Sequence, residues 1–480
     1  MNCKRESQID GPHFVDTAVA RVEGATREGR RGWSLTRVVD MEARDRGAVA
    51  LAAAGVLARV LLACLGWTDA ASERLELASP VDALARIREG HALWGMGQSP
   101  YGGSALHAPP LYLALIGPLV AHVPSGITAF VPFLVADLAV AAAVHTVATA
   151  MRRSRGGSAR GSGADASPAW VAAMYLANPF SIASCTALSS AGFRAMCIAV
   201  ALAGAVNGKP PVAGAGVAAL AYLGDPTCAA LMLPSLAIAM AHNGGFGGSG
   251  DGARKARGRA AEVKSFETRV FGSAGHLCAW TLGWCVALGC VSQAMVAPAG
   301  VAPMDWIRAT YGFRFVAEDL SPNLGCFWYF FTEMFDNFRD FFLFVFNYFP
   351  AVLAVPVIVR LGADAPVFCV FVARLLCVVF SPYPTLGDAA GYLALLPLFR
   401  VELRGMTAGY LVCAGYVVSA MLSPIMWRLW IVDRVANANF FFATTLAWMA
   451  TQSALCVLCV KRVAEHTRVA KAKLTTKKTK

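Results

Sequence analysis

Charged side chains are scarce in this sequence. Only 15% of its 480 residues are Asp, Glu, Lys or Arg, whereas 57% are hydrophobic, and the mean hydropathy is +0.53. Soluble domains carry about 25% charged residues, so this composition excludes a single water-soluble fold. A membrane-spanning helix needs roughly 20 apolar residues, and such stretches recur from Gly47 to Val460. The sequence therefore predicts an all-α polytopic membrane protein.

The sequence motifs of catalysis and metal binding are also missing. It has no Walker-type phosphate loop, no HExxH and no nucleophile elbow, and its eight histidines are scattered without a partner at ligand spacing. All fourteen cysteines except Cys3 lie in or beside apolar stretches, so they indicate neither a disulfide framework nor a zinc site. The CxxC spacing of Cys456 and Cys459 falls inside an apolar helix and is interpreted as packing. We predict no catalytic residue, no metal and no cofactor.

The net charge of +12 is concentrated in tails and loops. Basic segments beside membrane helices are normally topology signals, so nucleic-acid binding is not expected. The positive-inside rule predicts a cytosolic N-terminal extension (1–46), a membrane domain (47–460) and a cytosolic tail (461–480). Within the membrane domain it predicts cytosolic loops at about 151–168, 241–270 and 400–406, and luminal loops at about 68–109, 298–340, 381–390 and 428–439. An even number of spans, about ten to fourteen, satisfies this pattern.

Both ends of the chain favour the endoplasmic reticulum. No cleavable signal peptide is visible, because 46 mostly polar residues precede the first apolar run, and Gly47–Trp67 is expected to be an uncleaved anchor. The chain closes on Lys477-Lys478-Thr479-Lys480, which resembles a dilysine retrieval signal. We therefore expect a multi-pass protein of that membrane with both termini in the cytosol.

Unusual polar residues gather in the loops predicted to be luminal. Polar groups are costly near lipid, so their clustering indicates a binding site. Asp388 follows the turn Tyr383-Pro384-Thr385, and Asn437 and Asn439 precede the last apolar stretch. Each of them could contact a lipid headgroup or could simply cap a helix, since Asp and Asn are favoured at helix starts.

Two aromatic regions flank these polar residues. Phe327–Phe349 carries Glu333, Asp336, Asn337 and Asp340 at i, i+3, i+4 and i+7, which predicts one helix lying flat at the luminal interface. Tyr101 and His107 bracket the entry to a membrane segment, where we expect a structural turn with headgroup contact. The carboxylates of the first luminal loop lie beside arginines and are interpreted as ion pairs, although a glycosyltransferase would also require an acid there; they are Asp69, Glu73 and Glu76.

A run of residues in the second half of the chain resembles a known family. Asp319-Leu320-Ser321-Pro322-Asn323-Leu324-Gly325, followed by Phe327-Trp328-Tyr329-Phe330-Phe331 and Glu333-Met334-Phe335, resembles the U-subunit family of the glycosylphosphatidylinositol (GPI) transamidase, PIG-U. Supporting matches keep the family order; they are Ser72-Glu73-Arg74, Ser99-Pro100-Tyr101, His107, Asn178-Pro179, Tyr383-Pro384-Thr385, Gly387-Asp388 and the stretch from Trp427 to Asn439.

This resemblance implies a non-catalytic subunit of the endoplasmic reticulum with a helical bundle similar to that of lipid-linked-sugar mannosyltransferases (GT-C-like). It implies as partners the caspase-like catalytic subunit PIG-K, PIG-T, PIG-S and a GPAA-type subunit, together with the GPI lipid and the C-terminal signal of the proprotein. Asn437, Asn439 and Phe440 match the family's Asn-x-Asn-Phe stretch, associated with the lipid-linked glycan. Asp388 and Tyr383 match its Tyr-Pro-Thr-x-Gly-Asp turn, whereas Trp328 and Glu333 match an aromatic run that is expected at the interface.

Three classes of function stay open at this point. The subunit is favoured by the resemblance. A mannosyltransferase that uses polyprenyl-phosphate mannose would need one indispensable acid in the first luminal loop. A transporter would prefer inverted repeats and charges at mid-membrane; no repeat is found, and Asp137 and Arg374 are the candidate pair. Ala108, Pro109 and Asp225 depart from the family pattern, so direct headgroup contact is not expected at those positions.

Overall fold

The computed structural model describes residues 43–103, 105–155, 167–243 and 259–478. Residues 1–48 and 49–480 separate as two compact units, and only the start of helix α3 is described in the first. The predicted N-terminal extension lies almost wholly outside the described residues, and so does the part 244–258 of the predicted cytosolic loop 241–270.

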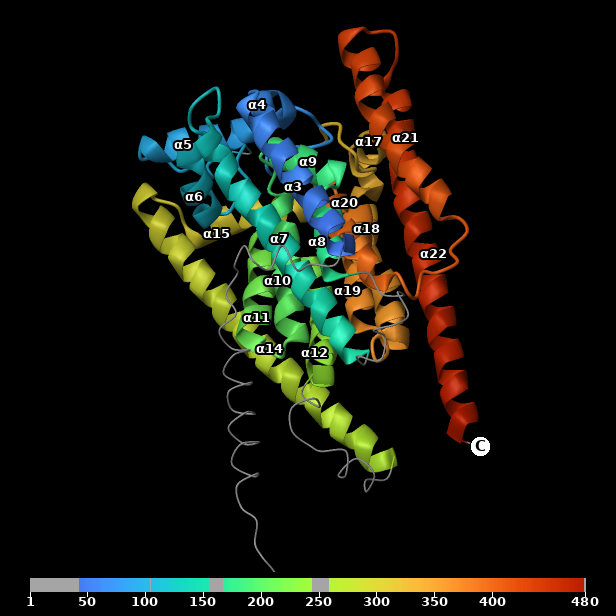
Figure 1. Ribbon diagram of the computed structural model, residues 1–480. Helices are drawn as coiled ribbons and strands as arrows, with labels where there is room; N and C mark the ends of the chain where they lie inside the picture. The colour runs from blue at the N-terminus through green and yellow to red at the C-terminus, as the bar shows by residue number, and fades with distance from the viewer. Residues whose placement is uncertain (1–42, 104, 156–166, 244–258, 479–480) are drawn as a thin grey trace, which may run out of the picture. The chain divides into compact units, whose positions relative to one another are not determined.

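Every regular element in the described ranges is helical, which confirms the all-α prediction (Figure 1). The first half contains α3 (Ala43–Cys64), α4 (Trp67–Ser72), α5 (Leu84–Gly95), α6 (Pro110–Val120), α7 (Ile127–Ser154), α8 (Pro168–Leu176), α9 (Pro179–Thr186), α10 (Ala191–Val206), α11 (Pro210–Tyr222) and α12 (Pro226–Asn243). The second half contains α14 (Arg259–Val296), η2 (Ala297–Ala299), α15 (Pro303–Ile307), η3 (Arg308–Gly312), α16 (Phe313–Val316), α17 (Phe327–Glu333), α18 (Asp336–Leu361), α19 (Pro366–Val379), α20 (Leu386–Leu393), η4 (Leu396–Phe399), α21 (Gly409–Trp427), η5 (Arg428–Val432) and α22 (Ala438–Lys478).

Six of the helices in the described ranges are long and apolar enough to cross a membrane. They are Asp45–Cys64, Ile127–Ser154, Lys264–Ala299, Asp336–Leu361, Gly409–Val432 and Ala438–Lys473. Another six apolar helices of 10–17 residues lie among them, chiefly between α10 and α12 and at α19 and α20. The chain is thus an all-α polytopic membrane protein whose interior is built largely from helices shorter than a full span.

Proline defines where many of these short helices begin. Proline at the first helical position loses no hydrogen bond, because the N–H groups there have no intrahelical partner. Helices α6, α8, α9, α11, α15 and α19 all begin on a proline. In α8 and α9 the preceding Ser167 and Asn178 also cap the helix, since their side chains accept from the N–H of Trp170 and Phe180. The Pro-rich breaks in the sequence are therefore helix starts inside the membrane domain.

Small residues allow the central helices to approach closely. Helix α10 packs between α7, α11 and α12, and α14 runs along α11 and α12, while α21 and α22 lie side by side (Figure 1). A Cβ atom built on Gly216 of α11 would lie 2.6 Å from the carbonyl oxygen of Cys197 and 2.7 Å from the amide nitrogen of Ala201 in α10. Only glycine fits at this crossing, as is common where membrane helices meet.

The loops predicted to be luminal meet at one end of the helices. Arg86 donates to Asp319 over 2.5 Å, and the amide of Leu386 donates to the carbonyl oxygen of Glu76 over 2.8 Å. A further hydrogen bond joins the Tyr329 hydroxyl to Asn439. These three contacts link all four segments that the charge rule assigned to the lumen.

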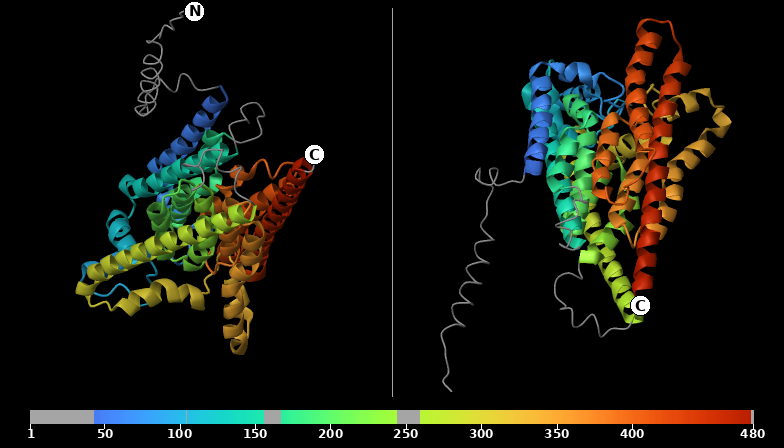
Figure 2. Two further views of the ribbon diagram at one scale, coloured as in Figure 1. Left: turned by 90° about the horizontal axis from the view of Figure 1, so that it is seen from below. Right: turned by 45° about the vertical axis from the view of Figure 1, so that its right-hand side comes forward.

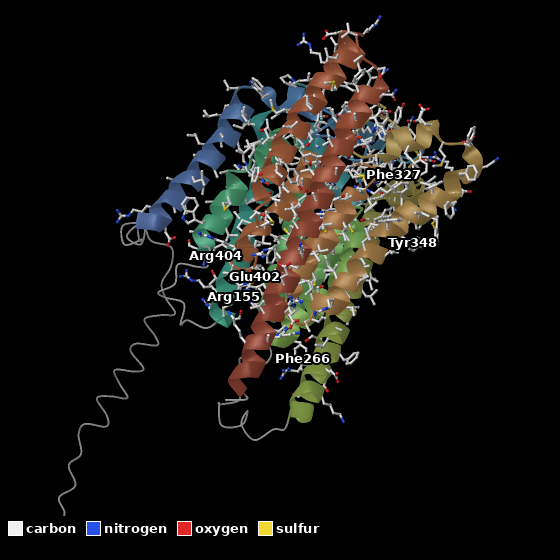
Figure 3. All side chains as sticks on the ribbon, turned by 90° about the vertical axis from the view of Figure 1, so that its right-hand side faces the viewer. Arg155, Phe266, Phe327, Tyr348, Glu402 and Arg404 are labelled. Carbon is white, nitrogen blue, oxygen red and sulfur yellow. The ribbon has the colours of Figure 1, made fainter. Side chains whose placement is uncertain are left out.

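The segments predicted to be cytosolic meet separately from these. Arg155 donates to Glu402 over 2.5 Å, and Arg462 of α22 donates to the carbonyl oxygen of Arg404. The His242 ring lies 3.0 Å from the carbonyl oxygen of Ala363. Figure 3 shows Arg155, Glu402 and Arg404 gathered together and apart from Phe327. The two groups of loops are therefore consistent with the predicted alternation, while the side that faces the lumen stays a prediction.

The aromatic stretch 327–349 differs from the prediction of one continuous interfacial helix. Met334 has an extended backbone, with φ −83° and ψ 145°, and this break separates the seven residues of α17 from the 26 residues of α18. Asp336 starts the first turn of α18, where a carboxylate is favoured by the helix dipole. The polar spacing from Glu333 to Asp340 is therefore not one face of one helix. Figure 2 shows α17 and α18 as a bent pair.

Candidate functional site

Six charged side chains form a connected series in the interior, where three of the predicted luminal loops meet α10, α19 and the turn between α11 and α12. Its members alternate in sign and belong to different elements; in order they are Asp82, Arg194, Asp388, Arg374, Asp225 and Arg314. The successive closest nitrogen–oxygen distances are 3.9, 3.0, 2.6, 2.5 and 3.8 Å. Three positive and three negative charges balance, which is how ionised groups are tolerated away from water. We call this arrangement the charge ladder.

Asp388 holds the middle of the charge ladder. Its carboxylate accepts from Arg194 over 3.0 and 3.1 Å and from Arg374 over 2.6 Å. It also accepts from the amide and the hydroxyl of Thr385, while the Thr385 hydroxyl accepts from the Asp388 amide, which makes a capping box at the start of α20. Both carboxylate oxygens are thus engaged, so Asp388 fixes the turn from Tyr383 to Thr385 against α10 and α19.

Three rings stack into a buried column beside this turn. The rings of His107 and Phe313 are 3.4 Å apart, and those of Phe313 and Tyr383 are 4.9 Å apart, with interplanar angles of 14° and 12°. The His107 Nδ1 lies 2.8 Å from the carbonyl oxygen of Ala309, and the Tyr383 hydroxyl accepts from the amide of Asp319. The column therefore ties the first predicted luminal loop to two later ones.

An open cleft of about 650 Å³ lies over the His107 end of this column. Tyr101, Asp305, Arg308 and Glu318 contribute to its lining. Burial raises the pKa of the Tyr101 phenol, whose hydroxyl donates to the carbonyl oxygen of Ala108 over 2.9 Å. Tyr101 therefore remains a neutral wall residue of the cleft.

Two ion pairs hold the first predicted luminal loop, Arg86–Asp319 to a later loop and Arg88–Asp69 within the loop itself. Burial raises the pKa of the Asp319 carboxyl, but hydrogen bonds from Ser321 and from Arg86 lower it by more, so it lies below the ordinary value of 3.8. The same balance holds for Asp69, where hydrogen bonds from Arg88 and Ser125 outweigh burial. Both carboxylates are charged at neutral pH and are neutralised by their arginines.

A second cluster, the aromatic platform, lies where α17, η5 and the start of α22 meet. Trp328 is buried and stacks on Trp430 with ring centroids 6.1 Å apart, and it contacts Phe441 and Phe442 at 5.8 and 6.0 Å. Tyr329 stacks on Phe442 at 4.5 Å. Buried aromatic pairs of this kind contribute roughly 0.5–1.5 kcal/mol each beyond their area. The platform therefore fixes the start of α22.

Asn437, Asn439 and Phe440 are exposed above this platform. Phe440 is 56% exposed, although its neighbour Phe441 is fully buried. The Asn437 side chain accepts from the amide of Asn439 over 3.1 Å, so it does cap the helix start, and the Asn439 side-chain oxygen accepts from the Tyr329 hydroxyl. Both asparagines are exposed next to the exposed ring of Phe440 in the sequence.

Comparison with known proteins decides the family. The family described as "GPI transamidase subunit PIG-U" matches residues 53–448, which is most of the chain. The chain belongs to the PIG-U family. The GPI-anchor transamidase component PIGU of Cricetulus griseus is 29% identical over 417 residues, covering 79% of this chain and 85% of the relative. The human component of that name is 28% identical over 415 residues, with the same coverage. The GPI transamidase component GAB1 homolog of Schizosaccharomyces pombe is 26% identical over 374 residues, covering 78% and 82%.

In this PIG-U family member the predicted site residues fall into two groups. Asn437, Asn439, Phe440 and Trp328 belong to the aromatic platform and its exposed edge, and Glu333 is exposed at the end of α17. Asp388, Tyr383 and His107 are buried, and Tyr101 lines the cleft above them. The site residues predicted from the sequence therefore form one exposed group and one buried group. That either group binds a ligand stays a prediction.

The transporter interpretation had paired Asp137 with Arg374, and this pairing is wrong. Asp137 of α7 binds Arg59 of α3 at 2.8 Å and accepts from the Tyr175 hydroxyl at 2.6 Å, whereas Arg374 belongs to the charge ladder. Sequence reasoning also missed Arg59 and Arg194. An arginine within an otherwise apolar helix was the available signal, because such a residue requires an acidic partner inside the bundle.

Proposed function

We propose that this chain is a non-catalytic subunit of a GPI transamidase complex in the endoplasmic reticulum membrane, with both termini in the cytosol. Membership of the PIG-U family and the names of its relatives support the complex. Its partners in this proposal are a caspase-like catalytic subunit, PIG-K, together with PIG-T, PIG-S and a GPAA-type subunit. Its task is to recognise the GPI lipid or the C-terminal signal of the proprotein.

The exposed edge of the aromatic platform is the observation that supports recognition of the GPI lipid. A GPI glycan presents hydroxyl groups next to apolar sugar faces, and it is anchored in a bilayer. Exposed amides at Asn437 and Asn439 suit hydroxyl groups, and the exposed ring of Phe440 suits a sugar face or an apolar chain. The platform beneath is rigid, so little ordering entropy is lost on binding.

Asp388 and Tyr383 act in this proposal by positioning rather than by contact. The polar atoms of Asp388 are already paired within the charge ladder, and the Tyr383 hydroxyl is engaged by the Asp319 amide. They hold the loops over the membrane domain in one arrangement. Their loss is expected to act through the fold.

Two of the three carboxylates that a mannosyltransferase could use, Asp69 and Glu76, are paired within the structure, whereas Glu73 is exposed. Asp69 is paired with Arg88 at 2.5 Å and with the Ser125 amide at 2.7 Å. Glu76 is buried, accepts from the Ser423 hydroxyl at 3.1 Å and lies 3.4 Å from Arg74. These pairings favour a structural role for Asp69 and Glu76 over general-base chemistry.

Complementation tests the proposed function. The chain is expressed in cells that lack their own PIG-U, GPI-anchored proteins are counted at the surface by flow cytometry, and the catalytic subunit is sought by pull-down. We expect restored anchoring with co-purification. A chain that reaches the endoplasmic reticulum but neither restores anchoring nor binds a transamidase subunit would favour the mannosyltransferase, and Asp69, Glu73 and Glu76 would then be substituted one at a time.

The double substitution Asn437→Ala with Asn439→Ala tests the contact surface. Removing both amides leaves the platform rings in place, so we expect lower GPI attachment with unchanged assembly. Asn337→Ala, which alters another exposed asparagine at the start of α18, is the control and should leave attachment unchanged. Normal attachment by the double variant would remove these residues from the proposed site.

A further inference from the structure

A groove that no part of the proposed function uses lies between α12 and α18. It encloses about 540 Å³, within the roughly 300–1,000 Å³ of preformed ligand sites. Its walls are mostly apolar and come from both helices and from α16; they are Ala230, Leu231, Phe315, Leu343, Phe344, Tyr348 and Ala351, with Thr227 and Asn347. Figure 3 shows Tyr348 on α18. A site with such walls suits a hydrocarbon chain.

A charged side chain lines a second cavity next to the groove. A smaller cavity of about 50 Å³ shares Thr227, Phe315 and Asn347 with it and is also lined by Arg314 and Asp225. The Asn347 side chain donates to the carbonyl oxygen of Phe315 over 2.8 Å, which fixes α18 to α16 where the two spaces join. The apolar groove and the cavity lined by the Arg314 guanidinium are therefore adjacent and share one wall.

Arg314 is the least committed member of the charge ladder. Its side chain is only 11% exposed, its nearest carboxylate oxygen lies 3.8 Å away on Asp225, and its Nε has no hydrogen-bond partner among the described residues. Asp225 is held more tightly by Arg374, at 2.5 Å. A buried guanidinium with a free donor is costly unless an acceptor satisfies it, and a phosphate is the acceptor that its geometry fits best.

We propose that this groove binds a glycerophospholipid of the surrounding bilayer, with one acyl chain between α12 and α18 and the phosphate on Arg314. The positive charge of Arg314 complements the negative charge of the phosphate. Basic pockets between membrane helices bind lipid headgroups by the same attraction. The bound lipid completes the packing of α18, whose aromatic side chains at 344 and 348 are otherwise exposed.

The position of the groove separates this lipid from the GPI surface proposed above. The groove uses Phe344, Asn347 and Ala351 of α18, whereas Phe342 and Phe346 face α17 and contact Phe330 there. The aromatic platform continues from α17 to Phe442 and Asn439. The groove and the contacts with α17 therefore use different faces of α18, and the inference does not depend on the function proposed above.

Lipid binding to the full-length purified chain tests the inference. Phosphatidylcholine and a diacylglycerol with the same acyl chains are titrated in detergent, and bound lipid is counted by native mass spectrometry. Arg314→Gln is expected to lower phosphatidylcholine affinity about tenfold, the loss expected for a charge-assisted hydrogen bond, and Arg314→Lys to retain most of it. Diacylglycerol has no phosphate, so its binding should be unchanged by Arg314→Gln.

Ala351→Trp provides a test that is independent of the charge. The larger ring fills the groove and should remove phosphatidylcholine binding, whereas Val352→Trp alters the next residue, which is 63% exposed outside the groove, and should not. Thermal unfolding of every variant identifies any that fail to fold. Unchanged phosphatidylcholine affinity in either Arg314→Gln or Ala351→Trp would overturn the inference, as would one-for-one displacement of phosphatidylcholine by purified GPI lipid.

Discussion

At the scale of single residues, the charge ladder makes Asp388 the most sensitive side chain. Asp388→Asn would leave Arg194 and Arg374 facing each other without a shared carboxylate. Breaking a buried ion pair from one side costs about 3–5 kcal/mol, and we expect a loss of this size in the free energy of unfolding. Thermal or denaturant unfolding of the purified chain measures it.

Asp433→Asn is the matched control for this substitution. Asp433 pairs with Arg428 at 3.5 Å, but the two side chains are 38% and 73% exposed. We expect its change in unfolding free energy to lie within about 0.5 kcal/mol, as is usual for surface positions. Equal stability of the two variants would show that the ladder contributes little.

Asp319 gives a prediction about pH. Its pKa is lower in the folded chain than the ordinary 3.8, so its contribution to stability is present above that value and is lost as the pH falls through the folded pKa. The melting-temperature difference between the natural chain and Asp319→Asn should therefore be constant from about pH 7 to about pH 5 and shrink only below about pH 4. Thermal scans across this range check it, and a difference that shrinks above pH 5 would contradict the assignment.

The site residues show how far sequence reasoning reaches at this scale. Asn437 and Asn439 could be named because they belong to a cluster of polar residues beside an apolar stretch and match the family's Asn-x-Asn-Phe stretch. The same logic named Asp388 but could not assign it to Arg194 and Arg374, because pairing across 194 and 14 residues depends on helix packing. For the same reason it paired Asp137 with the wrong arginine. Residue type predicts that a buried charge needs a partner, while only the fold identifies the partner.

At the scale of helices, the α10–α11 crossing depends on Gly216. Gly216→Val would place a branched side chain against the backbone of Cys197 and Ala201, and overpacking of this kind costs about 1–3 kcal/mol. We expect a lower melting temperature for the purified chain. Gly283→Val in α14 is the control, since no atom lies within 4 Å of its added Cβ. If the two variants melt alike, the close crossing is not a constraint.

Hydropathy predicted the long helices better than the short ones. Runs such as Ile127–Ser154 and Gly409–Val432 exceed a bilayer thickness, and their existence follows from length alone. The apolar stretch from Trp170 to Met240 lies between two predicted cytosolic loops, which requires an even number of crossings but does not locate them, and the structure divides it into five short helices, α8 to α12. The break at Met334 was missed because aromatic residues continue through it, and no Gly or Pro signals the extended backbone there.

At the scale of the whole molecule, the assignment of two sides to the membrane can be tested with glycan acceptors. The natural sequence contains no Asn-x-Ser/Thr site. Gly102→Asn completes one in a predicted luminal loop, and Gly405→Asn completes one with Met406 and Thr407 in a predicted cytosolic loop. We expect only the Gly102 variant to gain a glycan, seen as an endoglycosidase-sensitive mass shift. Modification of the Gly405 variant alone would invert the topology.

The charge ladder also constrains how this molecule can change through evolution. Its six members come from segments that are distant in the sequence, yet their charges sum to zero. A descendant that loses one carboxylate keeps an uncompensated arginine. Loss of a carboxylate is therefore tolerated only when an arginine of the ladder is lost with it. Across relatives, positions 82, 194, 225, 314, 374 and 388 should therefore covary, so that a substitution in one loop is accompanied by a compensating substitution in another segment.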